Sequence, residues 1–252
     1  MTAFTAVERD WLDLMWCLDA FRQADLKPPT MQVKTVDALN RKKGDWFAEL
    51  IALLLQNRTS QGIGARTKIQ GFSQYHQIDV AWPSRKHDPL ICIETKVTGA
   101  PAVTVTQQPK PPRNATADWS NRRKELKFAA TDLKLYRRQR ETSIEHWDVW
   151  RADAPPKTYF VWAARINPPA DDIGRMADQL RQLTETYLDG AALIAWTENT
   201  SSKRYDRVSL ATADRVRTVD DLLHRISTQI KTLAPEGQPP KPVVHDTAFT
   251  DD

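Results

Sequence analysis

The sequence predicts an α/β sandwich, a central sheet covered by helices, and three observations carry this prediction. Strand-like and helix-like segments alternate through the second half of the chain. Two of the strand segments, 158–164 (TYFVWAA) and 191–197 (AALIAWT), lack an alternating polar face, which is typical of strands buried on both sides. The chain has 252 residues, 40% of them hydrophobic, enough to bury the core of one or two domains.

Two helices are expected in the first quarter of the chain. Residues 7–21 carry apolar side chains at mostly helical intervals, so they form an amphipathic helix. Residues 43–57 repeat this pattern, with Glu49 inside the helix. Three short strands should follow, at residues 66–72, 77–82 and 90–97.

A connection of 21 residues, 98–118, opens the next part of the chain. It holds four prolines and shows no periodicity, and loops of this length are usually functional or disordered. At the other end, the proline-rich segment 235–252 cannot assemble a core and should form a flexible tail. Between them we expect a helix at 119–140, a strand at 158–164, a helix at 171–188, a strand at 191–197, an edge strand at 205–210 and a helix at 219–233.

Composition and charge exclude several classes of protein. The longest apolar run, 50–55, has six residues, whereas a membrane-spanning helix needs about 20. Glu8, Asp10 and Asp13 interrupt the N-terminus where a secretory signal would be apolar, so we expect a cytoplasmic protein. Two cysteines are too few for a disulfide scaffold, and a tetrahedral zinc site is not expected either. The net charge of +4 permits a polyanionic partner without requiring one.

The two strands that flank the loop PSRKHDP carry the most informative residues. They should form an antiparallel hairpin, and any register that pairs Trp82 with Ile91 also places Asp79 opposite Glu94. Side chains alternate along a strand, so Lys96 lies on the same face as Glu94. Two carboxylates that repel each other favour a cation between them, and an oxygen-rich site suits Mg²⁺ or Mn²⁺.

These residues resemble a known family. Asp79, fourteen intervening residues and Glu94-Thr95-Lys96 are similar to the D…(D/E)xK signature of the PD-(D/E)xK nuclease superfamily, which includes many type II restriction enzymes. Ile78 stands where the signature often has proline. The resemblance implies the restriction endonuclease-like fold, a three-layer α/β/α sandwich with a central mixed sheet. It would divide the chain into an N-terminal helical extension (1–35), a nuclease domain (36–234) and the flexible proline-rich tail (235–252).

The resemblance also implies a role for each site residue. Asp79, Glu94 and the Thr95 carbonyl would hold a Mg²⁺ ion, for which Mn²⁺ can substitute, and Lys96 would position or activate the attacking water. Glu49 matches the glutamate that the first helix of the family commonly adds to the acidic site, where it would hold a water or a second ion. Taken singly, each residue also has a plainer interpretation, as part of a surface ion pair or of a solvated helix face.

A DNA partner is expected because positive charge concentrates in the predicted helix 119–140. Eight Lys and Arg residues stand there against two acidic residues, an excess larger than the +4 of the whole chain. Such a face suits phosphate contacts, although an ordinary solvated helix has the same pattern. The candidate DNA-binding residues of this helix and of the preceding loop are Gln107, Gln108, Arg113, Asn114, Arg122, Arg123, Lys124 and Lys127.

The sequence therefore predicts a Mg²⁺-dependent DNA endonuclease, with a type II restriction enzyme that cuts double-stranded DNA at a specific sequence as the leading subclass. Cutting both strands favours a homodimer, for which the N-terminal helix with exposed tryptophans is a candidate interface. Two alternatives stay open. One is a nuclease of repair, transposition or phage defence without intrinsic sequence specificity. The other is a nucleic-acid-binding protein that kept the fold and lost catalysis.

Overall fold

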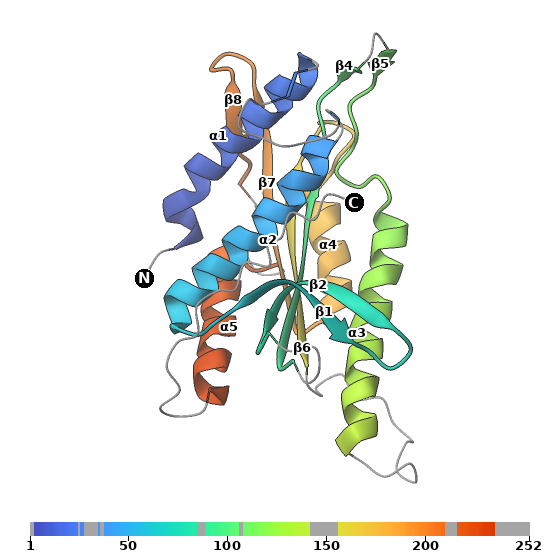
Figure 1. The fold of residues 1–252 in the computed structure, drawn as a ribbon. Coiled ribbons are helices and arrows are strands. Elements are labelled where there is room, and N and C mark those ends of the chain that lie inside the picture. The colour runs from blue at the N-terminus through green and yellow to red at the C-terminus, as the bar shows by residue number, and fades with distance from the viewer. Residues whose placement is uncertain are drawn as a thin grey trace.

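The fold is built around one mixed sheet of six strands (Figure 1). The computed structural model describes residues 3–24, 26–27, 35, 38–84, 89–105, 108–141, 156–209 and 216–234. The strand order is β1-β2-β3-β6-β7-β8, with the central pairs β3–β6 and β6–β7 parallel and the outer pairs antiparallel. The bounds are Gly64–Gln70 (β1), Tyr75–Trp82 (β2), Ile91–Thr98 (β3), Lys157–Arg165 (β6), Gly190–Asn199 (β7) and Arg204–Arg207 (β8).

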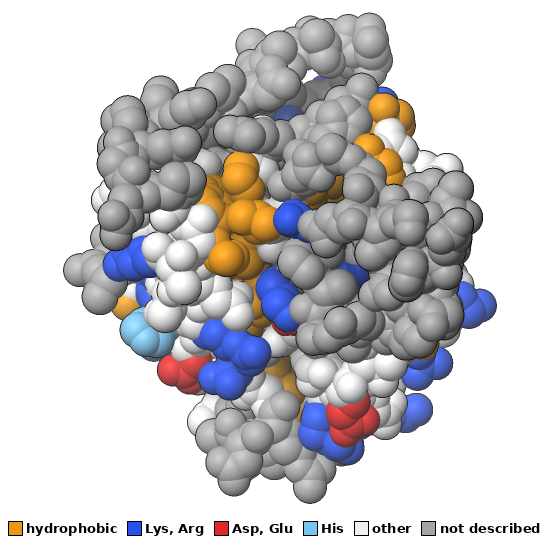
Figure 2. All heavy atoms as spheres, turned by 90° about the horizontal axis from the view of Figure 1, so that it is seen from below, with side chains coloured by type: hydrophobic (Ala, Val, Ile, Leu, Met, Phe, Trp, Pro, Cys, Tyr) orange, Lys and Arg blue, Asp and Glu red, His pale blue; other side chains and the backbone are white. Residues whose placement is uncertain are grey.

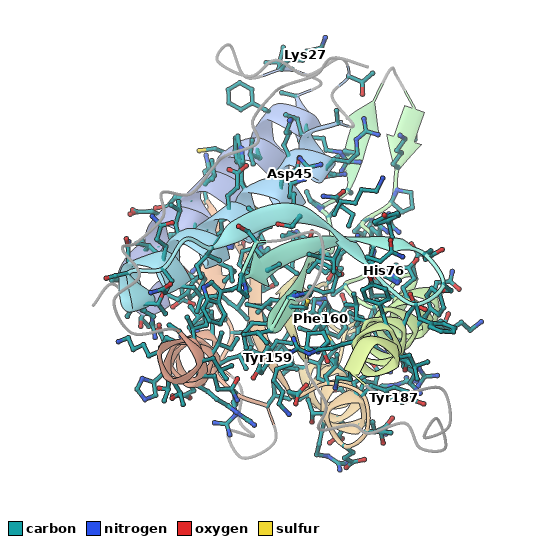
Figure 3. The ribbon with its side chains drawn as sticks, turned by 60° about the horizontal axis from the view of Figure 1, so that its bottom comes forward. Lys27, Asp45, His76, Tyr159, Phe160 and Tyr187 are labelled. Atoms are coloured by element: carbon teal, nitrogen blue, oxygen red, sulfur yellow. The ribbon has the colours of Figure 1, made fainter. Side chains whose placement is uncertain are left out.

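Helices cover both faces of this sheet because its central strands are apolar on both sides. Along β6, Tyr159 and Val161 belong to one apolar cluster, whereas Phe160 and Trp162 belong to another. Figure 3 shows Tyr159 directed toward α5 and its neighbour Phe160 directed toward α3. The predicted α/β sandwich is therefore confirmed. The first cluster packs under α1 (Phe4–Gln23), α2 (Ala38–Thr59) and α5 (Val219–Leu233), and the second under α3 (Trp119–Glu141) and α4 (Ile173–Thr184).

Most predicted elements are present, with shifted ends. Helix α5 has the predicted bounds, whereas α2 begins at Ala38 and α4 ends at Thr184. The largest difference lies in the segment 98–118, which was expected to lack regular structure. It contains a two-stranded ribbon, β4 (Val103–Val105) and β5 (Gln108–Lys110). Strands of three residues are too short for a periodic pattern to identify them in the sequence.

Helix α1 is part of the main core. Trp11 is 4% exposed and packs on the ring of Phe47 with centroids 5.0 Å apart. Trp16 meets Tyr205 edge to face, also at 5.0 Å. Trp11 is buried and Trp16 is half-buried, because the apolar face of the helix packs on the core. The expectation of exposed tryptophans is therefore wrong for Trp11, and the interface prediction loses that support. The domain boundaries stay predictions, and the tail lies outside the described residues.

None of the helices in the described part of the chain has a stretch long and apolar enough to cross a bilayer.

Candidate active site

The candidate site lies where β2 and β3 part from each other. The two strands pair only at Trp82 with Ile91, Ala81 with Cys92 and Val80 with Ile93. Trp82 does pair with Ile91, which is the condition under which the sequence places Asp79 opposite Glu94, and extending this register by one residue makes them opposite. Beyond the last pair, β2 stays with β1 and β3 stays with β6. This divergence opens a space between β2, which carries Asp79, and β3, which carries Glu94 and Lys96.

The Asp79 carboxylate bridges the two strands at this point. Its Oδ2 atom accepts the backbone N–H of Thr95 at 2.8 Å and the Thr95 hydroxyl at 3.0 Å. A side chain thus takes a hydrogen bond that a continued strand ladder would give to the backbone. Both bonds end on Oδ2, so they fix the orientation of the carboxylate without using its second oxygen.

A cleft of about 710 Å³ opens above these residues. Its floor is the exposed part of β2 and β3, with Asp79, Glu94, Thr95 and Lys96. Helix α2 supplies one wall, and Figure 3 shows Asp45 on this helix, on the side of the β4–β5 ribbon. The opposite wall comes from the segment before α3 and from its first turns. The charged and amide side chains of the two walls include Asn40, Arg41, Lys43, Asp45, Arg113, Asn114, Asp118, Asn121, Arg122 and Glu125.

Burial perturbs all three ionisable residues on the floor. It raises the pKa of Glu94 well above its ordinary value, and the charge of Asp79 adds to the rise. Burial also raises the pKa of Asp79, against the lowering effect of the two bonds from Thr95. The pKa of Lys96 is lowered, first by burial and then by the charge of Arg122. The carboxylates therefore favour a proton or a further cation, and the amine loses its proton more readily than an exposed lysine.

Helix α2 presents a different acidic residue to the cleft from the one predicted. Asp45 lines the cleft, whereas Glu49, half-buried and one helical turn further along α2, is not among the lining residues that the structure describes. Residues four apart share a helix face, so periodicity alone did not distinguish the two. Asp45 also faces Arg66 at 3.5 Å and Lys42 at 3.9 Å. Asp45 is the site residue that the sequence reasoning missed.

The candidate DNA-binding residues separate into two groups. Arg113, Asn114 and Arg122 line the cleft. Arg123 and Lys124 are exposed on α3 but outside the cleft lining, and Lys127 lies over the ring of Tyr187 at 4.6 Å. Gln107 lies outside the described residues, and for Gln108 only the backbone, in β5, is described.

The positive face of α3 is smaller than its sequence predicted. Lys134 is 2% exposed and forms an ion pair with Asp189 at 3.1 Å. Its charge is therefore paired inside the protein and does not add to a positive surface. Arg137 donates to the Pro89 carbonyl at 3.5 Å. Positive charge is not confined to α3, since Figure 2 shows Lys and Arg side chains spread over the lower face with fewer Asp and Glu among its described residues.

Aromatic stacking and a buried carboxylate fix the wall that carries Arg122. Trp119 stacks on Trp162 with centroids 4.3 Å apart and planes at 3°. The Trp162 indole N–H donates to the Thr98 hydroxyl at 2.7 Å, at the end of β3. Asp171 is buried and accepts the backbone N–H of Ala115 at 2.9 Å. The start of α3 is therefore held in place against the sheet.

Gly99 is required where β3 ends. Its φ of +79° is a conformation that other residues rarely adopt, and an added Cβ would lie 1.9 Å from the Arg165 carbonyl oxygen. Directly after it, Ala100 and Arg113 exchange two backbone hydrogen bonds of 3.0 Å. These bonds close the base of the β4–β5 ribbon and bring Arg113 to the cleft.

The donors on the cleft floor fit a small divalent cation only in part. Two carboxylates and backbone oxygen atoms are ligands that Mg²⁺ and Mn²⁺ prefer. The described residues contain no group of three or more His, Cys, Asp or Glu side chains arranged to hold a metal ion. Mg²⁺ needs only one or two protein carboxylates, because it keeps several waters and takes substrate oxygens. Comparison of the chain with protein-family models, curated proteins and solved structures finds no match.

Proposed function

We propose that this protein is a Mg²⁺-dependent DNA endonuclease of the PD-(D/E)xK type, with the restriction endonuclease-like fold. The observation that carries the proposal is the convergence of Asp79, Glu94 and Lys96 on the floor of one cleft, with both carboxyl pKa values raised and the amine pKa lowered. Perturbed groups of opposite type in one cleft are typical of active sites. The signature spacing in the sequence supports the same assignment.

Asp79, Glu94 and the Thr95 carbonyl are the proposed ligands of the cation. A bound Mg²⁺ would supply Lewis-acid stabilisation of the negative charge that develops on the phosphate. The hydrogen bonds from Thr95 orient Asp79 for this role. The raised pKa values of the two carboxyls also favour a cation, which relieves their repulsion. Asp45, in place of Glu49, is the acidic residue of α2 proposed to assist.

Lys96 is proposed to position the attacking water or to take its proton. Its side chain leaves β3 on the face that carries Glu94, and its lowered pKa means that the amine loses its proton more readily than an exposed lysine. The basic side chains of the walls, above all Arg113 and Arg122, suit the phosphate backbone of double-stranded DNA. The protein is further proposed to act in the cytoplasm as a homodimer, with one active site for each DNA strand. Sequence-specific restriction stays the leading subclass, with repair, transposition or phage defence as the alternative.

One observation favours a second candidate, a nucleic-acid-binding protein without catalysis. The charges of Arg122 and Lys96 both lower the pKa of Glu94, so side chains of the cleft offset part of the acidic charge without a metal ion. In that case these residues would form a stable ion cluster under a basic rim. DNA would still bind, but adding Mg²⁺ would change neither its integrity nor the stability of the protein.

Plasmid and phage DNA, each incubated with the protein in Mg²⁺ or in EDTA, test the proposal. We expect cleavage only with Mg²⁺, and none with Asp79→Asn. Asp10→Asn, an exposed change on α1, is the matched control and should cleave like the wild type. Discrete bands support restriction, whereas general nicking supports the alternative nuclease. DNA that binds but stays intact in Mg²⁺ overturns the nuclease and supports the second candidate.

A further inference from the structure

The hairpin formed by β1 and β2 packs one of its two faces on α3. The Nε2 atom of His76 lies 2.7 Å from Asp132 Oδ2, and Figure 3 shows His76 between the hairpin and α3. Ile69 and Ile78 are buried on the same face, in a cluster with Leu133 of α3. The apolar residues of the hairpin are therefore used for packing against this helix.

The opposite face of the hairpin is polar and exposed. Side chains alternate along a strand, so Lys68 of β1 and both Tyr75 and Gln77 of β2 lie on this face, and all three are exposed. We call these three residues the outer hairpin face. Lys68 is directly opposite Gln77, and its Nζ lies 5.0 Å from the centre of the Tyr75 ring. Residues 64–78 include two basic residues and no Asp or Glu, so the surface suits a polyanion.

A rotation of the hairpin brings its outer face to the cleft. Val80 packs in the cluster that includes α2, whereas Ile78, two residues earlier in β2, packs in the cluster with α3. Regular alternation would keep these two side chains on one face. The backbone departs from regular strand geometry between them and on the paired strand, where Arg66 has a φ of +54°. Gln77 consequently lines the cleft together with Asp79.

The turn of the hairpin is held in place by Asp132. The Oδ1 atom of this buried residue accepts the backbone N–H of Ser73 at 2.9 Å and the Ser73 hydroxyl at 2.7 Å. Its carbonyl accepts the backbone N–H of Phe72 at 3.1 Å. An added Cβ at Gly71 would lie 2.1 Å from Asp132 Oδ2, so the contact depends on this glycine. The hairpin is thus oriented before a ligand binds, which lowers the entropic cost of binding.

We propose that the outer hairpin face enters the major groove of the DNA that lies in the cleft, where Lys68 and Gln77 contact base edges. A two-stranded β-ribbon fits this groove, and Lys and Gln are residue types that read guanine and adenine there. Gln77 and Tyr75 are two and four residues from Asp79, about 7 and 13 Å along the strand. At about 3.4 Å per base pair, the contacts fall about two to four base pairs from the scissile phosphate. The inference rests on the proposed function and deepens it.

A double substitution, Lys68→Ala with Gln77→Ala, tests the inference. It should weaken binding of a short fluorescein-labelled DNA duplex roughly tenfold or more, measured by anisotropy with Ca²⁺ as the cation, because contacts in the groove are lost. Because the Gln77 amide also donates to the Arg66 carbonyl, Lys68→Ala is measured alone as well and should produce part of the loss. A second duplex carries glucosylated 5-hydroxymethylcytosine, whose sugar fills the major groove. The wild type should bind this duplex roughly tenfold more weakly than the plain one, and the double variant should discriminate less between the two.

Gln182→Ala with Lys231→Ala is the matched control, since it removes the same two side-chain types from exposed positions on α4 and α5. It should bind both duplexes like the wild type. If the Lys68 and Gln77 double variant behaves like this control, or if the wild type binds the two duplexes equally, the inference fails, while plasmid cleavage in Mg²⁺ still supports the proposed function. If the wild type binds neither duplex, the inference fails, and if it also leaves plasmid intact in Mg²⁺, the proposed function fails with it.

Discussion

Replacing Glu94 by glutamine should stabilise the protein while it abolishes cleavage. Asp79 and Glu94 lie just beyond the last pair of β2 and β3, and the charge of Asp79 raises the pKa of Glu94. Two unit charges about 5–8 Å apart repel by about 2–3 kcal/mol at an effective dielectric constant of about 20. Lys96 and Arg122 offset part of this repulsion. We therefore expect the free energy of unfolding to rise by about 1–2 kcal/mol near neutral pH in EDTA.

The assay is thermal unfolding of the wild type and the Glu94→Gln variant over a range of pH. A gain of this size raises Tm by about 3–6 °C in a chain of this length. Burial and Asp79 raise the folded-state pKa of Glu94, so the wild type loses stability relative to the variant as pH rises from about 4.3 through the raised value. The gain should be absent below that window and complete above it.

Mg²⁺ should reverse the comparison, because a ligand that binds only the folded wild type stabilises it. Glu185→Gln, an exposed change at the residue that follows α4, is the matched control and should shift the free energy of unfolding by less than about 0.5 kcal/mol. A Glu94→Gln variant that is less stable than the wild type at neutral pH in EDTA would falsify the reasoning. It would mean that the glutamate is a net stabilising ion-pair partner and not a strained metal ligand.

Three further outcomes follow from particular contacts. Asp45→Asn should reduce the initial rate of cleavage in Mg²⁺ roughly tenfold or more, because Asp45 lines the cleft, whereas Glu49→Gln should leave the rate near that of the wild type. If Glu49→Gln lowers the rate and Asp45→Asn does not, Glu49 is the residue that assists. Asp132→Asn should destabilise the protein most near neutral pH, because its histidine and serine bonds hold the folded-state carboxyl pKa below its usual value. That stability is lost as pH falls through the lowered pKa, so equal loss at all pH values in urea titrations would contradict the assignment. Asp19→Asn leaves the buried Lys43 without its carboxylate partner, so it should lower the free energy of unfolding by about 3–5 kcal/mol. A decrease under about 1 kcal/mol would show that solvent reaches the lysine.

The sheet and its helices were largely predictable because they follow hydrophobic periodicity. Apolar runs identified β6 and β7, and an amphipathic pattern identified α5 with its bounds. For β2 and β3 the sequence predicted the hairpin, whereas the structure supplied the pairing of Trp82 with Ile91 on which the opposition of Asp79 and Glu94 depends. The β4–β5 ribbon was not predictable, since strands of three residues carry too little pattern.

The sequence by itself determined which residue types meet on the cleft floor, because alternation along two paired strands fixes the faces of Asp79, Glu94 and Lys96. Only the tertiary structure decided what surrounds them. Whether Asp45 or Glu49 reaches the cleft depends on how far α2 slides along the sheet, and residues one turn apart are equivalent in sequence. The place of Arg122 in the wall of the cleft depends likewise on the packing of Trp119 against β6, a contact between segments far apart in the chain.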